Sequence, residues 1–214
     1  METILWTRKD GYLFLKEHLD RAERTQFFFK RKWNRSKVLE ILNSYNFLSE
    51  KSRVRLLADE FGNIQLESFP LEKIGWFNDS LKILLSRKRT DPDNPFLRHK
   101  TTNRYLYNNS YKNTLKKGFD EVIFENLSKN ITEGAISNIF IRVLDDNWQT
   151  PPVKCGLLPG IWRDKMITKL SVSEKILTSN DLAKAKEILI GNSVKGTGKV
   201  TEIRNFSDKI IFKK

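Results

Sequence analysis

The sequence contains very little cysteine or histidine. Its 214 residues include a single cysteine, Cys155, and only two histidines, His18 and His99. One cysteine cannot form an internal disulfide, and two histidines without a cysteine cluster do not make a structural zinc site. We therefore expect no metal, and a fold that is stabilised by its hydrophobic core.

Long hydrophobic runs are also missing. No stretch approaches the ~20 apolar residues that are needed to span a bilayer. The first residues, Met1 to Arg8, lack the apolar segment of a signal peptide. Because 39% of the residues are hydrophobic, the chain can still form one large core or two modest ones. These features predict a globular, cytoplasmic protein with no membrane partner.

The net charge of +13 raises the alternative of a nucleic-acid partner, because clustered Lys and Arg side chains bind phosphate backbones. The basic residues are spread from Arg8 to Lys214, and their densest run lies between Phe29 and Lys37. The sequence has no zinc-finger spacing, no aromatic run of the RNP type and no Lys-rich tail. We therefore predict no nucleic-acid partner, and a positive field that suits a small anionic substrate.

The first half of the chain mixes helical and strand patterns. Its predicted elements are a short first strand, helices over 12–29 and 36–45, a hairpin formed by 53–58 and 64–69, and a strand over 81–85. The segment 91–95, Asp-Pro-Asp-Asn-Pro, is rich in residues that interrupt secondary structure. We place the domain boundary there, with a small N-terminal α/β subdomain over 1–92 and a larger C-terminal α/β subdomain over 93–214.

The second half shows the same mixture. Its predicted elements are a helix over 103–117 closed by Gly118, strands over 121–125 and 138–143 around a polar turn at 129–134, a helix from Pro159 and Gly160 to Leu170, a helix from Ser179 or Asn180 to Ile188, and strands over 200–203 and 209–212. Helices and strands do not alternate strictly, and no repeat is visible. The pattern favours an α+β or mixed α/β fold over a doubly wound sheet.

A lysine, Lys100, lies between the breaker-rich segment and the start of the next predicted helix. A lysine whose pKa is lowered by burial and by cationic neighbours can attack an aldehyde, and Arg98 and Arg104 are candidate neighbours. An isolated lysine in a loop is more often a solvated surface charge. The lysine segment alone therefore leaves both readings open.

Three further segments follow in order: Asn130 to Phe140 (NITEGAISNIF), Thr150 to Pro152 (TPP) and Gly156 to Arg163 (GLLPGIWR). Together with the segment from Phe96 to Tyr105, they resemble the class IV aminotransferase family, which includes branched-chain aminotransferases, D-amino acid aminotransferases and aminodeoxychorismate lyases. The resemblance extends to His18-Leu19-Asp20-Arg21 and to Asn192-Ser193-Val194-Lys195-Gly196. It implies a two-subdomain fold of PLP fold type IV, similar to D-amino acid aminotransferase, with pyridoxal 5′-phosphate (PLP) as the cofactor.

The resemblance gives each matched residue a role. It implies that Lys100 is the Schiff-base lysine and the catalytic base, and that Glu133 faces the pyridine nitrogen and keeps it protonated. The other implied cofactor-binding residues are Tyr105 for the phenolic oxygen and, for the phosphate, Arg21, the backbone N–H groups of Ile161 and Trp162, and the hydroxyl of Ser193. Without the resemblance, Glu133 would be a turn residue in water, Arg21 a surface charge and Tyr105 a packing residue.

The segment from His99 to Arg104 is similar to the aminodeoxychorismate lyase branch. This implies a lyase of folate biosynthesis that converts 4-amino-4-deoxychorismate to 4-aminobenzoate and pyruvate, as a homodimer with a functional link to aminodeoxychorismate synthase. Members of this branch carry a Tyr-Gly-Asp-Gly-like segment ahead of the position of Glu2, which this sequence does not show. The substrate therefore stays open between the lyase and a PLP-dependent amino acid transaminase of the branched-chain or D-amino acid type. Outside the enzymes, the alternative is a catalytically silent basic protein.

Overall fold

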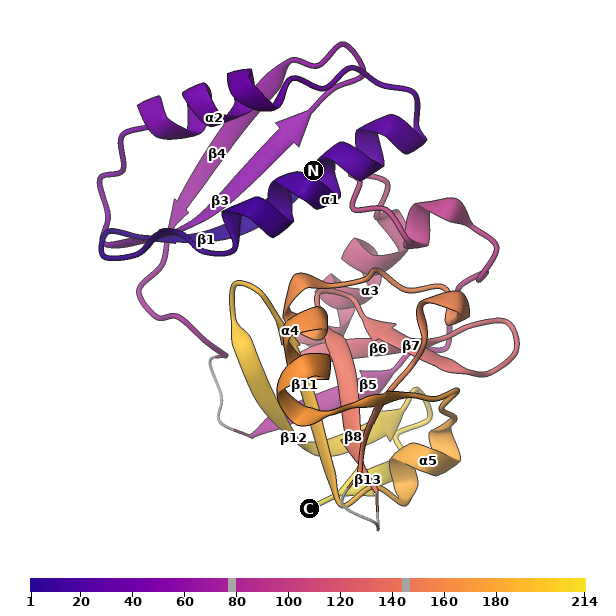
Figure 1. Cartoon of the computed structure of the whole chain (residues 1–214). Helices are drawn as coiled ribbons and strands as arrows, with labels where there is room; N and C mark the ends of the chain where they lie inside the picture. Colours follow the sequence, from indigo (N-terminus) through magenta and orange to yellow (C-terminus); the bar gives the residue numbers. More distant parts are fainter. Residues whose placement is uncertain (77–79, 144–146) are drawn as a thin grey trace. The chain divides into compact units, whose positions relative to one another are not determined.

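A computed structural model describes residues 1–76, 80–143 and 147–214 of the chain (Figure 1). The chain divides into two compact units. The first unit comprises residues 1–74 and 99–102, and the second comprises residues 75–98 and 103–214. Within the described residues, no helix is both long enough and apolar enough to cross a membrane.

The first unit is an antiparallel sheet with two helices packed on it (Figure 1). Its elements are β1 (Glu2–Thr7), β2 (Gly11–Tyr12), α1 (Leu15–Phe28), α2 (Arg35–Ser44), β3 (Lys51–Ala58) and β4 (Ile64–Pro70), and the strand order is β2-β1-β3-β4. Leu19 of α1 and Leu42 of α2 meet Leu56 of β3 in a buried cluster. The two predicted helices of this unit are confirmed.

The predicted hairpin of the first unit is also confirmed, since β3 and β4 pair antiparallel from Ala58 and Ile64 onward. Along β3, side chains that are buried alternate with side chains that are not, as expected for a strand with one face on the core. Asp59 closes the connecting turn, because its Oδ1 accepts hydrogen bonds from the backbone N–H groups of Phe61 and Asn63. Gly62 has a φ of +85°, a conformation that favours glycine.

The second unit is a mixed sheet with helices packed against individual strands. Its strands are β5 (Leu81–Leu85), β6 (Glu121–Glu125), β7 (Ile131–Gly134), β8 (Asn138–Arg142), β9 (Trp148–Thr150), β10 (Ser173–Glu174), β11 (Glu187–Asn192), β12 (Gly196–Asn205) and β13 (Ile210–Lys213). The order is β10-β9-β8-β11-β12-β5-β6-β7, and β13 pairs with β12. The helices are α3 (Tyr105–Lys116), α4 (Ile161–Leu170) and α5 (Ser179–Ala183), and short 3-10 turns cover Pro95–Leu97 and Val153–Cys155.

Aliphatic side chains of the central strands form the main core of the second unit. Ile83, Ile123, Ile139, Ile190 and Val200 are among its members, and each of them is almost completely buried. Helix α3 packs on β6, α4 on β11 and α5 on β13. The predicted strands over 81–85 and 121–125, and the predicted helices ending at Gly118 and Leu170, are confirmed.

The predicted polar turn over 129–134 is only partly right. The turn lies earlier, where Oδ1 of Asn126 accepts hydrogen bonds from the N–H groups of Ser128 and Asn130. Residues Ile131–Gly134 form β7, which pairs antiparallel with β6. Glu133 is therefore a residue of a buried strand and not of an exposed turn.

The predicted helix from Ser179 to Ile188 is wrong in its second half. Helix α5 ends at Ala183, and its start is fixed by a capping box between Thr178 and Asp181. Residues Glu187–Asn192 form β11, which lies between β8 and β12. Because Ile188 and Ile190 are buried in the sheet core, tertiary packing decides the conformation of this short apolar run.

Candidate active site

Lys100 lies in the short segment His99–Thr102 of the first unit, and its side chain is half-buried. The neighbouring His99 packs this segment against the end of α1. Its ring stacks on Phe28 with 4.1 Å between centroids, and its Nδ1 lies 3.4 Å from Oγ1 of Thr25. The backbone that carries the Lys100 amine is therefore held against a helix.

Arg21 lies on α1 and is buried against Glu2 of β1. Its Nε donates to Oε1 of Glu2 over 3.0 Å, and its Nη2 donates to Oε2 over 2.6 Å. Burial alone would raise the pKa of Glu2, but the charge of Arg21 and the hydrogen bonds from His18 and Arg21 outweigh burial and hold this pKa well below its usual range. The forked ion pair fixes the orientation of the guanidinium.

His18, one turn before Arg21 on α1, binds the same carboxylate. Its Nδ1 lies 2.7 Å from Oε2 of Glu2. Burial lowers the pKa of His18 more than the neighbouring Glu2 raises it, so the neutral imidazole donates through Nδ1. Among the described residues, Nε2 of His18 has no hydrogen-bond partner.

In the second unit, Glu133 lies near the end of β7 and is 7% exposed. Its Oε1 accepts a hydrogen bond from the Tyr107 hydroxyl over 3.1 Å. Its Oε2 accepts one from the backbone N–H of Leu158 over 3.1 Å, and the Asn138 amide lies at 3.5 Å. Donors from a helix, a loop and the next strand therefore hold this carboxylate in one position.

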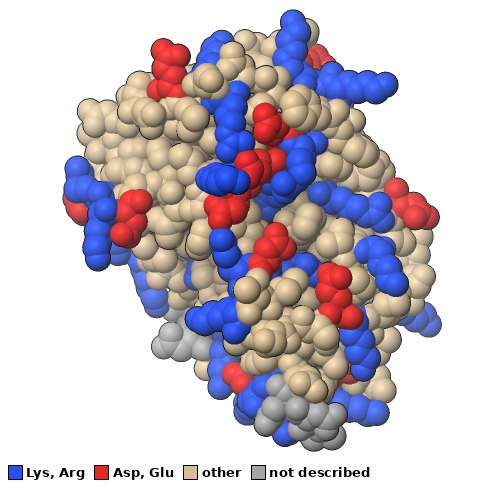
Figure 2. All heavy atoms as spheres, viewed as in Figure 1, with Lys and Arg blue, Asp and Glu red and all other residues tan. Residues whose placement is uncertain are grey.

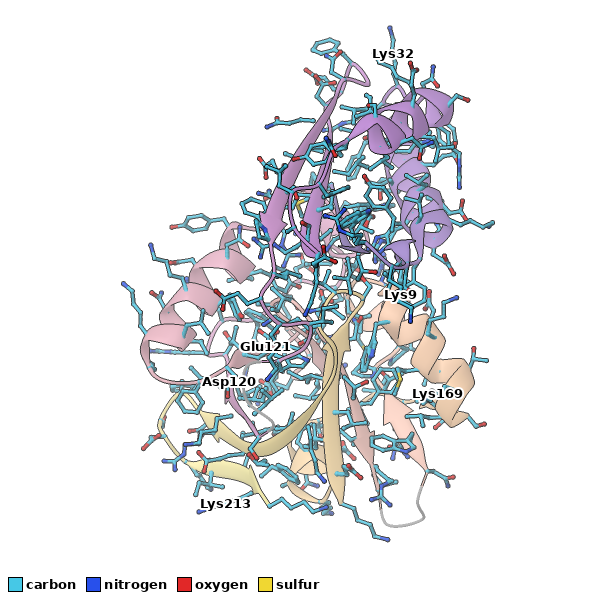
Figure 3. The ribbon with its side chains drawn as sticks, turned by 90° about the vertical axis from the view of Figure 1, so that its left-hand side faces the viewer. Lys9, Lys32, Asp120, Glu121, Lys169 and Lys213 are labelled. Carbon is cyan, nitrogen blue, oxygen red and sulfur yellow. The ribbon has the colours of Figure 1, made fainter. Side chains whose placement is uncertain are left out.

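A second buried carboxylate, Glu121 of β6, shapes the turn that follows Glu133. Figure 3 shows Glu121 among the strands of the second unit. It accepts hydrogen bonds from the backbone N–H groups of Val122, Ala135 and Ile136 and from the hydroxyl of Ser137. Burial outweighs these four donors and raises the pKa of Glu121 to about 7. The turn between Glu133 and Asn138 thus depends on a carboxyl group that titrates near neutral pH.

The start of α4 offers donors for an anion. Gly160 is its N-cap and supplies no side-chain cap, so the N–H groups of the first turn, including those of Ile161 and Trp162, point out of the helix end. The Trp162 ring is buried, and its Nε1 donates to Oγ1 of Thr197 over 3.2 Å. Gly191 of β11 allows this packing, because a Cβ there would lie 2.4 Å from the Trp162 ring.

Ser193 lies half-buried in the turn between β11 and β12. The side chain of Asn192 forms this turn, since its Oδ1 accepts hydrogen bonds from the N–H groups of Val194 and Lys195. The Asn192 amide also donates to the carbonyl of Ile136, over 2.9 Å. The turn with Ser193 is therefore tied to the turn that follows Glu133.

Tyr105 and Tyr107 lie on different sides of α3. Tyr105 is 79% exposed, whereas Tyr107 is buried and bonded to Glu133. Each residue turns a helix by about 100°, so positions two apart point in nearly opposite directions. Within the second unit, the structure joins Glu133 to Tyr107, which the sequence did not single out, and the role of Tyr105 stays a prediction. The signal for Tyr107 in the sequence is its position two residues after the predicted Tyr105.

The groups in each unit, considered separately, match the chemistry of PLP. The cofactor has an aldehyde, a basic ring nitrogen and a phosphate. The first unit carries a primary amine at Lys100 and an oriented guanidinium at Arg21. The second unit carries a buried carboxylate at Glu133 and an uncapped helix N-terminus at α4. These donors and acceptors fit the cofactor that the resemblance implies.

Comparisons with known proteins agree with this chemistry. A protein of Schizosaccharomyces pombe with the provisional name aminodeoxychorismate lyase is 26% identical over 204 residues, which cover 90% of this chain and 84% of the relative. The crystal structure of a provisionally named amino-acid aminotransferase from Mesorhizobium loti is similar at a TM-score of 0.87 and 29% identity, over 95% of this chain and 98% of that chain.

The PLP-bound form of a provisionally named aminotransferase from Mycobacterium tuberculosis is also similar, with a TM-score of 0.76 and 15% identity, over 100% of this chain and 82% of that chain. At this identity the likeness concerns the fold alone. The family model described as amino-transferase class IV matches residues 1–203, which is nearly the whole chain. This chain belongs to the class IV aminotransferases, a family of PLP-dependent enzymes with a mixed α/β fold.

Proposed function

We propose that this protein is a PLP-dependent lyase that converts 4-amino-4-deoxychorismate to 4-aminobenzoate and pyruvate. The observation that carries the proposal is the buried Glu133 carboxylate, which a phenol, an amide and a backbone N–H hold in place. A carboxylate held in this way suits a protonated pyridine nitrogen. The S. pombe relative, by its provisional name, supports the choice of the lyase reaction.

Each predicted site residue has a part in the proposal. Lys100 would hold the cofactor covalently through Nζ, and Tyr105 would bind its phenolic oxygen. The phosphate would be bound by the guanidinium of Arg21, the N–H groups of Ile161 and Trp162, and the hydroxyl of Ser193. When bound, PLP supplies an aldehyde that captures the substrate amine and a ring that accepts electrons.

The chain's own contribution to the reaction is proton transfer and positioning. The Lys100 amine, once the substrate amine has displaced it, would remove the proton from the amine-bearing carbon. The electron pair of that C–H bond would move toward the adjacent carbon, whose C–O bond breaks and releases the enolpyruvyl group. The released enol would take up a proton and become pyruvate, and the carbon ring of the substrate would become the aromatic ring of 4-aminobenzoate. The Lys100 amine would then displace the product amine, which frees 4-aminobenzoate and restores the covalent link of Lys100 to the cofactor.

The charge of the protein suits this substrate, which carries two carboxylates. The chain has 39 Lys and Arg against 26 Asp and Glu. On the face drawn in Figure 2, the basic side chains are interspersed with acidic ones and do not form one uniform patch. A diffuse positive field of this kind attracts small anions over a distance without binding them at the surface.

An amino acid transaminase is the second candidate. The M. loti structure favours it, since the 29% identity extends over nearly the whole length of both chains. A transaminase needs a second, keto-acid substrate, whereas the lyase completes its reaction with one substrate. We further propose a homodimer with a functional link to aminodeoxychorismate synthase. Sedimentation velocity would test the first part, and copurification of the two proteins the second.

The decisive experiment supplies purified protein and PLP with 4-amino-4-deoxychorismate and measures 4-aminobenzoate and pyruvate. The proposal expects the two products in equal amounts when no keto acid is added as a second substrate. A parallel panel of amino acids and keto acids tests the transaminase. Amino-group exchange with that panel and no 4-aminobenzoate would overturn the lyase assignment.

Covalent attachment of PLP is tested with Lys100→Ala. Borohydride should fix PLP to the wild type and to Lys9→Ala, because Lys9 is an exposed lysine of the same unit, but not to Lys100→Ala. A fixed adduct on another lysine of folded Lys100→Ala protein would show that the attachment site is wrong.

A further inference from the structure

Tyr107 is a feature of the second unit that the family resemblance does not explain. It lies on α3, and its ring packs edge-on against Phe124 of β6 with 4.9 Å between centroids. Leu97, Val122 and Ala135 belong to the same buried cluster. The ring is therefore fixed by apolar contacts, and its hydroxyl is aimed at one acceptor, Oε1 of Glu133.

Arg104 also contacts Tyr107. Its guanidinium lies 5.1 Å from the centre of the Tyr107 ring, and its Nη2 donates to the carbonyl of Ala135. The same arginine thus contacts the tyrosine and the turn that follows Glu133. A cation over a phenol ring strengthens the hydrogen bond that the phenol donates, because it favours negative charge on the oxygen.

The hydrogen bond matters because Glu133 is almost completely buried. Burial disfavours an ionised carboxylate, and donors to its oxygens offset that cost. An O–H donor to a carboxylate is among the stronger of these contacts. Burial, together with the charge of Glu133 and the hydrogen bond to it, raises the pKa of Tyr107 far above its usual value, so the phenol keeps its proton and remains a donor.

We propose that Tyr107, supported by Arg104, is a positioning residue that fixes the rotamer of Glu133 and favours its ionised form. The inference rests on the proposed function, because Glu133 acts there as the partner of the PLP ring nitrogen. Tyr107 itself touches neither the cofactor nor the substrate in this role. Its effect on cofactor binding is exerted through Glu133.

The test compares Tyr107→Phe, Glu133→Gln and the double variant. Tyr107→Phe removes one hydroxyl and keeps the packed ring. Tyr111→Phe is the matched control, since Tyr111 lies on the same helix and packs against the same cluster. The readout is the affinity of each cofactor-free protein for PLP, measured by quenching of tryptophan fluorescence between pH 5 and 9, together with the melting temperature.

In the wild type, affinity should fall at acid pH as Glu133 takes up a proton and loses its attraction for the ring nitrogen. Tyr107→Phe should weaken binding at pH 7 by about 10- to 100-fold and move this acid limb upward by about 1 to 2 pH units, the size of one hydrogen bond to a charged group. Glu133→Gln should remove the limb. Adding Tyr107→Phe to Glu133→Gln should then change PLP affinity by less than about 2-fold, since the two residues act as one unit.

The outcomes separate this inference from the proposed function. If the wild type binds no PLP through Lys100, the proposed function is wrong and the inference is wrong with it. If the wild type binds PLP and Glu133→Gln removes the acid limb, but Tyr107→Phe leaves the limb in place, only the inference is overturned. A purely structural role for Tyr107 would lower the melting temperature and weaken PLP binding equally in both backgrounds.

Discussion

The pKa of Glu121 leads to a prediction about stability and pH. Glu121 is fully buried and receives four hydrogen bonds, yet its pKa is raised from 4.5 to about 7. Replacing it with glutamine keeps the shape and removes the titration. Because the side-chain amide of glutamine must meet some of the same donors, the variant also loses about 1–3 kcal/mol at every pH.

The sign of the pH dependence of stability follows from the pKa of Glu121 in the folded and the unfolded protein. The unfolded carboxyl ionises near pH 4.5, whereas the folded one keeps its proton until about pH 7. Between these values the folded protein binds more protons, so the contribution of Glu121 to stability is present below pH 4.5 and is lost as the pH rises to about 7. A shift of about 2.5 units corresponds to about 3 kcal/mol.

The assay is urea unfolding of the wild type and Glu121→Gln at several pH values between 4.5 and 8, followed by tryptophan fluorescence. The stability advantage of the wild type should shrink by about 3 kcal/mol across this range, with unchanged urea dependence. Glu187→Gln is the control. Burial alone would raise the pKa of Glu187, but its contacts with Arg142 and Lys199 outweigh burial and lower it, so its window lies below about pH 4.5.

A difference between the wild type and Glu121→Gln that stays constant from pH 4.5 to 8 would refute the reasoning. It would mean that the four donors compensate the buried charge completely. A stability difference between wild type and variant that grows with pH would mean that the four donors more than compensate the buried charge. Either result would show that the turn that follows Glu133 does not lose stability as the pH rises to 8.

Three further predictions concern the cofactor residues and their packing. Arg21→Ala should raise the dissociation constant of PLP by about 10- to 100-fold and slow turnover of the loaded enzyme far less, because a phosphate anchor binds ground and transition states alike. A dissociation constant that is unchanged in equilibrium dialysis would contradict the phosphate role of Arg21. Glu133→Gln should still bind PLP but slow single-turnover product formation by about 100-fold or more, and near-equal rates would contradict its role at the ring nitrogen. Gly191→Ala should lower the free energy of unfolding by about 1–3 kcal/mol in urea titrations, because the new Cβ meets the Trp162 ring, and wild-type stability would show that this contact relaxes freely.

The elements that the sequence predicted correctly have local signals. Pro159 and Gly160 mark the start of α4, and Gly118, with a φ of +79°, follows the end of α3. The alternation along β3 gives the face that packs on the core. Such signals need no knowledge of distant residues, which is why they are readable from the chain alone.

The parts that the sequence did not predict depend on distant residues. The residues up to Ile188 read as the end of a helix until the partners of β11, the strands β8 and β12, are known. The contact between Tyr107 and Glu133 depends on which side of α3 packs on β6. The resemblance supplied Lys100, Arg21 and Glu133 as candidates, but not the residues that hold them, because those contacts form between elements far apart in the sequence.

Glu2 and Glu121 show why burial alone does not decide the behaviour of a carboxyl group. Both are completely buried strand residues, yet the pKa of Glu2 is lowered and that of Glu121 is raised. Glu2 is bonded to the cation Arg21, whereas the described donors to Glu121 are uncharged. In this pair, the contacts with the cation outweigh the effect of burial on the pKa and the uncharged donors do not. The ion pair between Glu2 and Arg21 should therefore persist across physiological pH, while the hydrogen bonds that Glu121 accepts in the turn after Glu133 change near pH 7.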